Sequence, residues 1–348
     1  MKGLALFSGG LDSALAVKVA QEAGATVEAL HFTSPFYQSK NGTEAPDYVV
    51  DLARQLGVKL HVQPYPEDYL RVIENPRFGY GKNMNPCTDC RIYGFKLAAS
   101  LFPKLEAAYL ITGEVVGQRP NSQRPDAMAI IDRESGLEGL VLRPLSALVM
   151  KPTIPEIKGW VDRSKLLGIK GRSRKEQLAL AERYGITGFA TPAGGCLLTY
   201  KEYGKKIADL LRYQGSLSYA EVNRLNLGRH FRVSPQAKVI VGRNQAENEK
   251  LCQLAREGDY LLEAKDYQGP LTIATGRVGS EELAAAAQLT ARYCDAPKDS
   301  PAPVAIVYRQ LTGKKPSAKD TEEQGEKTAA GVLLVTPAAE TCIQAWRI

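Results

Sequence analysis

The sequence has few histidines, no long apolar run and no export signal. Three histidines in 348 residues are too few for a histidine-based metal site. No run approaches the roughly 18 apolar residues that cross a bilayer, and the N-terminal segment lacks the continuous apolar stretch of a signal peptide. These absences argue against a membrane or exported protein. We therefore expect a cytoplasmic chain whose six cysteines are reduced thiols, metal ligands or catalysts rather than disulfides.

The charged residues are distributed unevenly along the chain. The whole sequence has a net charge of +7, yet residues 151–232 alone hold 16 Lys and Arg against 7 Asp and Glu. Such a basic segment attracts polyanions, of which nucleic acid is the commonest. A solvated helical surface rich in lysine gives the same pattern, so charge alone leaves both interpretations open.

Short apolar runs alternate with helical patterns in the first part of the chain. This alternation predicts an α/β fold, a doubly wound parallel sheet that binds ligands at the carboxyl ends of its strands. The expected strands are at 4–8, 26–32, 58–62, 108–112 and 139–142.

The pattern of apolar and polar residues changes twice in the rest of the chain. Residues 151–232 are mostly helical by pattern, and residues 233–348 alternate strands and helices as a small α+β domain. With residues 1–150 as the first domain, the sequence predicts three parts. Residues 313–327 are charged and poor in apolar side chains, as in a solvated loop.

The string Ser-Gly-Gly-Leu-Asp-Ser at residues 8–13 lies between the first strand and the first helix. Two glycines let backbone N–H groups approach an anion, and a helix N-terminus favours negative charge. Ser8 and Ser13 add hydroxyl donors, whereas Asp12 suits a metal ion or the orientation of a nucleophile. A glycine turn with Asp12 as a helix cap is the plainer alternative. The string is not a Walker loop, because GxxxxGK[ST] occurs nowhere.

Three cysteines stand in settings that suit chemistry. Cys87 and Cys90 form a CxxC before a helix, where Arg91 would help keep the thiols ionised, and Cys196 follows two glycines. Three thiolates leave one coordination position open, as in a reactive centre. Three interpretations stay open: an iron–sulfur cluster, a structural zinc site with a fourth ligand that the sequence does not indicate, and a persulfide on Cys196 that another cysteine resolves. Buried structural thiols are expected at Cys252, Cys294 and Cys342.

The motifs in residues 1–200 resemble the PP-loop ATP pyrophosphatases, and among them the catalytic domain of tRNA 4-thiouridine synthases. Besides the string at 8–13, the resemblance rests on Thr-Gly-Glu at 112–114, on Gly-Gln-Arg-Pro-Asn-Ser-Gln at 117–123, and on Leu-Arg-Pro-Leu followed by Lys151. It implies an ATP-dependent enzyme that adenylates a uridine carbonyl oxygen of tRNA, releases pyrophosphate and replaces the oxygen with sulfur.

The resemblance also implies cofactors and site residues. Asp12 would be a catalytic residue that organises Mg²⁺. The residues that would bind ATP are Ser8, Gly9, Gly10, Asp12, Ser13, His31, Thr112, Gly113 and Gln118. A CxxC with a distant third cysteine resembles the cluster-bearing tRNA thiolation enzymes, which implies a cluster, 4Fe–4S, on Cys87, Cys90 and Cys196. The implied contacts to tRNA are Arg119, Lys151, Lys170, Arg172, Arg174 and Lys175.

The C-terminal part resembles the RNA-binding domain of the NFACT ribosome-associated proteins. The resemblance rests on Gly242, Arg243 and Asn244 after a strand, on Glu247 in the next helix, and on a later Gly-Pro turn. It implies that Arg243 and Asn244 contact RNA. The alternative is that these residues only cap the helix.

Two features of the 4-thiouridine synthases are missing from this sequence. We find neither an N-terminal THUMP region nor a rhodanese signature, so RNA capture and delivery from the sulfur donor, sulfide or a persulfide carrier, are expected to be arranged differently. Two rivals remain: a PP-loop synthetase acting on a small molecule, and a zinc-stabilised RNA-binding protein without catalysis. The sequence indicates no oligomeric state.

Overall fold

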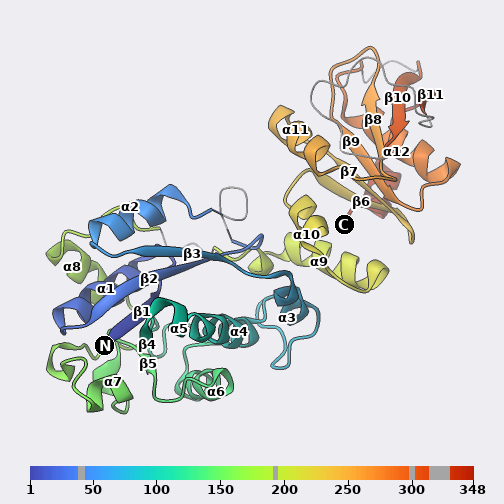
Figure 1. The fold of residues 1–348 in the computed structure, drawn as a ribbon. Helices are drawn as coiled ribbons and strands as arrows, with labels where there is room; N and C mark the ends of the chain where they lie inside the picture. Colours follow the sequence, from blue (N-terminus) through green and yellow to red (C-terminus); the bar gives the residue numbers. More distant parts are fainter. Residues whose placement is uncertain (38–43, 191–194, 298–301, 313–329) are drawn as a thin grey trace. The chain divides into compact units, whose positions relative to one another are not determined.

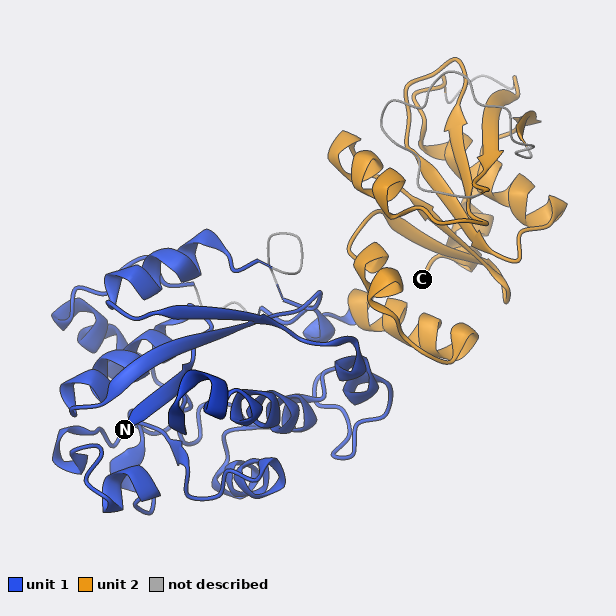
Figure 2. Ribbon diagram, in the orientation of Figure 1, with its two compact units in different colours: residues 1–201 blue, residues 202–348 orange. Residues whose placement is uncertain are grey.

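The chain forms two compact units, Met1–Lys201 and Glu202–Ile348 (Figure 2). The computed structural model describes residues 1–37, 44–190, 195–297, 302–312 and 330–348. The expected loop at 313–327 therefore lies outside the described residues. The expected middle part, 151–232, is divided between the two units. No helix in the described ranges is both long and apolar enough to span a bilayer.

The first unit contains a parallel five-stranded sheet in the order β3-β2-β1-β4-β5, coloured from blue to green in Figure 1. The central strand β1 is apolar on both faces because each face is covered: Leu4 and Ala5 belong to opposite hydrophobic clusters and are almost fully buried. The strands are β1 (Lys2–Leu6), β2 (Thr26–Thr33), β3 (Leu60–Pro64), β4 (Ala107–Ile111) and β5 (Val141–Leu142).

Helices cover both faces of this sheet, which confirms the predicted doubly wound α/β fold. Residues of α1, α2 and α8 form one buried cluster with the sheet, and residues of α4, α5 and α6 form the other (Figure 1). The helices are α1 (Leu11–Glu22), α2 (Asp47–Gln55), α3 (Leu70–Glu74), α4 (Cys87–Ser100), α5 (Phe102–Leu105), α6 (Pro125–Ser135), α7 (Ile154–Ile157) and α8 (Lys175–Arg183).

The second unit is built on an antiparallel six-stranded sheet in the order β11-β10-β8-β9-β7-β6. Helix α12 packs on one face, which confirms a C-terminal α+β fold. The strands are β6 (Arg229–Ser234), β7 (Ala237–Val241), β8 (Tyr260–Ala264), β9 (Thr272–Gly276), β10 (Val304–Gln310) and β11 (Ala330–Val335). The helices are α9 (Lys201–Gln214), which begins at the boundary, α10 (Tyr219–Leu225), α11 (Gln245–Leu254), α12 (Ser280–Tyr293) and α13 (Glu340–Trp346).

His230 is expected to make the second unit less stable in acid. Its ring is buried, and its Nε2 lies 2.8 Å from the carbonyl oxygen of Leu227. Burial lowers the pKa of His230 well below its usual value, and the nearby Lys238 and Lys206 lower it further. Below about pH 6.5 the unfolded chain takes up a proton that the folded unit excludes. The free energy of unfolding should therefore fall by about 1.4 kcal/mol per pH unit.

Urea unfolding at pH 6.5 and 5.5 measures this effect. A Trp160→Phe variant leaves Trp346 as the reporter of the second unit, since the chain has two tryptophans. A His230→Gln variant serves as the control, because its stability should change much less between the two pH values. An equal acid loss in that variant would assign the effect to other groups.

Candidate functional site

The turn at residues 8–13 connects β1 to α1 in a tight, glycine-dependent conformation. Gly9 has a φ of +72°, and a Cβ there would lie 2.7 Å from side-chain atoms of Tyr48 and Val49. Gly10 is the N-cap residue of α1, and its carbonyl oxygen accepts from the Ser13 hydroxyl at 2.8 Å. The turn therefore presents backbone N–H groups at a helix N-terminus, as an anion site requires.

Asp12 lies at the centre of a polar network. Its Oδ2 accepts from Gln118 Nε2 at 2.7 Å and from Arg174 Nη2 at 3.3 Å. Gln177, buried at the start of α8, donates to Gln118 Oε1 at 3.1 Å. Asp12 Oδ1, Arg174 Nε and Gln177 Oε1 are buried and have no hydrogen-bond partner. Buried polar atoms without partners cost free energy, so this network suits a ligand that would satisfy them.

Three other residues expected at the ATP site lie near the turn. Gly113 packs against it, because a Cβ there would lie 2.5 Å from the carbonyl carbon and oxygen of Asp12. His31 is in β2, and its Nδ1 donates to the carbonyl oxygen of Phe7 at 2.8 Å, since a carbonyl oxygen can only accept; burial lowers the pKa of His31. The Thr112 hydroxyl donates to Glu114 Oε2 at 3.2 Å and is fully buried.

Glu114 and Arg143 form a buried ionic network that the sequence analysis did not identify. Arg143 Nε donates to Glu114 Oε2 at 3.0 Å, and its two terminal nitrogens donate to Asp132 at 2.8 and 2.7 Å. Arg91 Nε lies 3.7 Å from Glu114 Oε1. Because Arg91 follows Cys90 directly, this network fixes the start of α4, where the CxxC lies.

The three cysteines lie on neighbouring segments. Cys87 is the first residue of α4, and Cys90 Sγ lies 3.1 Å from the hydroxyl oxygen of Tyr69 and 3.5 Å from that of Tyr37. Cys196 pairs with Tyr37 through an isolated antiparallel bridge. Gly194, which precedes this region, lies outside the described residues. Tyr37 thus links Cys90 to the segment of Cys196, and Tyr69 contacts Cys90 alone; the sequence indicated neither tyrosine.

All six cysteines are free thiols. Burial, and then the charge of Cys90, raise the pKa of Cys87; the same two causes raise the pKa of Cys196 to about 12. The charge of Cys90 thus acts on both of the other thiols. Within the described ranges, no three side chains of His, Cys, Asp or Glu converge closely enough to hold a metal ion as they stand. The donor set nevertheless suits a thiolate-ligated group.

Arg119 follows Gln118 in the chain, and its charge interacts with groups of both the CxxC and the turn at residues 8–13. Desolvation of its guanidinium by the surrounding protein, together with the charge of Arg91, lowers the pKa of Arg119. The charges of Cys87 and Asp12 act in the opposite direction. Its positive charge therefore acts on the CxxC and on the turn together. Asp12, Gln118 and Arg174 thus form one hydrogen-bonded network at the turn, and Tyr37 lies between Cys90 and the segment of Cys196.

The basic residues expected to contact RNA divide into two groups. Arg174 is bound to Asp12 at the phosphate turn, and so has a role within the site that the sequence did not indicate. The second group has exposed side chains with no hydrogen bond or ion pair to another described residue: Lys151, Lys170, Arg172 and Lys175. Lys170 lies beside Val116 in a parallel bridge. The loop before α8 thus runs along the segment that carries Gln118.

Arg243 and Asn244 both have contacts within the second unit. The Asn244 side chain caps α11 by accepting from Glu247 N at 3.0 Å, and Arg243 forms an exposed ion pair with Glu247. The Glu247 carboxylate also accepts from Gly228 N at 3.1 Å. These contacts agree with the helix-capping alternative, and RNA contact by the two residues stays a prediction.

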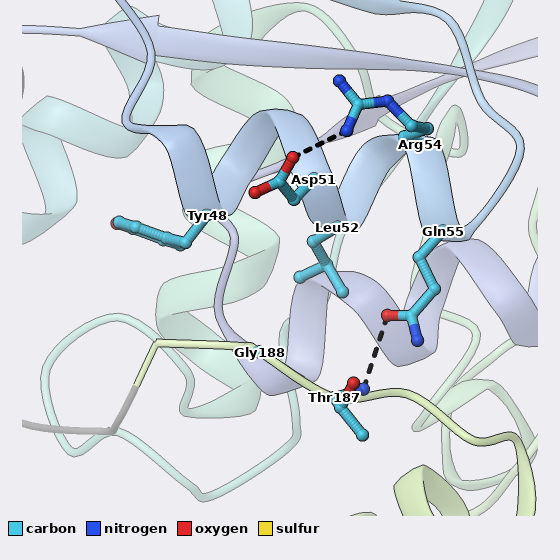
Figure 3. Close-up of a pocket in the computed structure, with 7 residues that line it drawn as sticks. All are labelled: Tyr48, Asp51, Leu52, Arg54, Gln55, Thr187 and Gly188. Carbon is cyan, nitrogen blue, oxygen red and sulfur yellow. Dashed lines mark hydrogen bonds and ion pairs between the residues drawn. The ribbon is translucent and has the colours of Figure 1, made fainter.

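A separate pocket of about 450 Å³ lies between α2 and residues 187–188 (Figure 3). It contains none of the cysteines or network residues described above, although its Tyr48 packs against Gly9. Two interactions at its rim are those of Arg54 with Asp51 and of Gln55 with Thr187. Its lining is Tyr48, Asp51, Leu52, Arg54, Gln55, Thr187 and Gly188.

Two regions of the chain match known protein families. Residues 1–157 match the family described as Thiamine biosynthesis protein (ThiI), and residues 228–347 match the NFACT protein RNA binding domain. Relatives of the first region are named "Probable tRNA sulfurtransferase". The protein from Staphylococcus aureus is 32% identical over 151 residues, and that from Moorella thermoacetica 34% identical over 152. The matches cover 41% and 42% of this chain but 34% and 36% of the relatives. The chain thus spans about a third of their length.

The solved structures that match this chain have low sequence identity to it. A 4-thiouridine synthetase in complex with RNA and ATP is 20% identical with a TM-score of 0.39; the match covers 65% of this chain and 51% of that one. The U34-tRNA thiolase NcsA from Methanococcus maripaludis, solved with its [4Fe-4S] cluster, is 17% identical with a TM-score of 0.34, covering 64% and 70%. The two family matches confirm both resemblances inferred from the sequence.

Proposed function

We propose that this chain is an ATP-dependent tRNA sulfurtransferase. The carrying observation is the Asp12 network: a helix-starting phosphate turn, two side chains fixed on one carboxylate oxygen, and the other oxygen buried without a partner. The match of residues 1–157 to a family whose relatives are named tRNA sulfurtransferases supports the same reaction class.

The proposed reaction has two steps. A uridine carbonyl oxygen attacks the α-phosphorus of ATP, which forms an O–P bond and breaks the P–O bond to pyrophosphate. Sulfide then adds to the ring carbon; the C–O bond breaks and AMP leaves with the electron pair. If a persulfide supplies the sulfur instead, its terminal sulfur adds in the same way, and the thiol of a second cysteine then breaks the S–S bond, which leaves a disulfide on the protein. AMP is a far better leaving group than the free oxygen, which is why ATP is needed.

The protein's part is to bind and orient. The backbone N–H groups of residues 8–13 would hold the pyrophosphate portion of ATP, and Gln118 and Arg174 would keep Asp12 in place. Mg²⁺ bound at the open Asp12 Oδ1 would offset phosphate charge. An iron–sulfur cluster held by Cys87, Cys90 and Cys196 would supply an iron that is free to bind sulfide.

Pyrophosphate release by the purified chain tests the proposal. We expect release that requires both ATP and unmodified tRNA, together with a new thionucleoside in the digested tRNA when a sulfur source is present. Exchange of pyrophosphate into ATP without RNA would instead indicate a small-molecule synthetase. Binding of tRNA with no use of ATP would indicate a non-catalytic RNA-binding protein.

Binding of tRNA should depend steeply on salt through the loop before α8. Changing Lys170, Arg172 and Lys175 to Gln together removes up to three phosphate contacts, each of which contributes about 0.9 to the slope of log affinity against log salt on duplex RNA or DNA. Arg174 stays unchanged, because it is bound to Asp12.

A matched control removes three other exposed lysines of the same unit, Lys59, Lys96 and Lys104. The control should keep the salt slope of the unchanged chain. Equal slopes for both triple variants would mean that the basic loop is only a solvated surface.

A further inference from the structure

The loop between α3 and α4 exposes aromatic and basic side chains and ends at Cys87, the first residue of α4. Figure 1 shows the course of this loop. Phe78 and Tyr80 each keep 39% of their surface exposed, and Lys82 is exposed as well. The Arg77 guanidinium lies 5.2 Å from the centre of the Phe78 ring. Apolar side chains that are exposed together mark interaction surfaces, and this loop presents two aromatic rings within three residues.

This loop is held in place by contacts at several points. The Asp89 carboxylate, inside the CxxC, accepts from the backbone N–H groups of Arg77 at 2.9 Å and Phe78 at 3.0 Å. The Tyr80 hydroxyl donates to the carbonyl oxygen of Ile73 at 2.7 Å, and Gly81 N donates to that of Asn85 at 2.8 Å. The backbone at Phe78 and the ring of Tyr80 are therefore held in place, so less entropy is lost when a partner packs against this loop.

The loop also borders the site on two sides. A Cβ at Gly81 would lie 2.4 Å from the Asn121 side chain, two residues beyond Arg119. Asn83 Nδ2 donates to the carbonyl oxygen of Thr199 at 2.7 Å, in the turn that follows Cys196. The aromatic surface is thus continuous with the segments that carry Arg119, the CxxC and Cys196.

Fixed aromatic rings among arginine and lysine are the features that bind unpaired nucleotides. Bases stack on the rings, the cations contact the adjoining phosphates, and RNA is read mainly where its bases are unstacked. We propose that Phe78 and Tyr80, with Lys82, form the docking surface for unpaired tRNA nucleotides next to the modified uridine. This inference rests on the proposed function and assigns its substrate to a part of the surface.

Affinity for unfractionated tRNA, measured on the full chain, tests the inference. Phe78→Ala and Tyr80→Ala should each weaken binding about tenfold, since stacking of one base contributes about that much. The salt slope should not change, because no counterion is released at a ring. Lys82→Gln should instead lower the slope by about 0.7, the value for one single-strand contact.

Two further variants separate stacking from a structural effect. Phe78→Trp should keep the affinity, and its added fluorescence should be quenched by bound tRNA. Ile157→Ala, a truncation of an apolar side chain that is 73% exposed in the same unit, should change nothing.

Unchanged affinity for tRNA in the Phe78→Ala, Tyr80→Ala double variant would overturn this inference, as would unquenched fluorescence in Phe78→Trp. Neither result would contradict the proposed function. If the unchanged chain bound no tRNA, the proposed function would fail and the inference with it.

Discussion

Asp12→Ala is expected to abolish pyrophosphate release, with a loss of at least about a hundredfold in rate. The carboxylate is the point on which Gln118 and Arg174 converge, and it carries the buried oxygen left open to a ligand. Without the Asp12 carboxylate, Arg174 loses its ion-pair partner next to the proposed phosphate site, and Gln118 loses the oxygen that holds its side chain in place. Removal of one preorganised electrostatic group from an active site typically costs about 10² to 10³ in rate.

The same variant should bind tRNA almost as well as the unchanged chain. Asp12 is largely buried, whereas the proposed RNA contacts are exposed side chains on other segments. Pyrophosphate release and tRNA affinity should therefore be measured on one preparation. Asp12→Asn is the matched control, because it keeps the shape and one hydrogen bond but not the charge. Pyrophosphate release at a comparable rate in the Ala variant would refute the assignment of the turn.

Loss of any one of Cys87, Cys90 and Cys196 should remove both a bound cluster and thiolation. Each thiolate would ligate one iron, so a cubane that is held by three ligands does not survive with two. The chain purified without oxygen should be brown and contain iron and acid-labile sulfide, and each Ala variant should contain far less. Cys252→Ala is the control, since Cys252 lies in α11 of the second unit, and it should keep both properties.

A different outcome would identify the other sulfur chemistry. If a colourless anaerobic preparation thiolates tRNA at full rate and only Cys196 is essential, the sulfur is carried as a persulfide. Zinc without iron in the purified chain would favour the structural metal site instead.

The sequence predicted those parts of the fold that depend on local patterns. Each of the five parallel strands appears within two residues of the expected start or end, because buried strands of a doubly wound sheet are continuous apolar runs. In the C-terminal part, β-type runs at 238–241, 270–274, 304–308 and 331–336 predict β7, β9, β10 and β11, but no such run indicates β6 or β8. Their polar and charged residues, such as Arg232 and Glu263, obscure the pattern, and pairing across the sheet decides their conformation.

The candidate site likewise contains parts that local sequence patterns predicted and parts that only the fold brings together. The turn at 8–13 could be found from sequence because glycine, serine and the strand before them act locally. The pairing of Asp12 with Arg174 could not, since 162 residues separate the two, and in the sequence Arg174 is one of several similar cations. Tyr37 and Tyr69 gave no signal either, because a tyrosine beside a thiol has no short motif.

Gly113 gives the site an unusual mutational profile. With no room for a Cβ beside the Asp12 carbonyl, every other amino acid at this position would push the two loops apart, however conservative the replacement. In a saturation scan, position 113 should therefore show no tolerated class at all, unlike its neighbour Val116, where apolar replacements should survive. A substitution in the turn at residues 8–13 or in the Thr-Gly-Glu segment would disturb the same close contact. We therefore expect the two segments to vary together among related sequences.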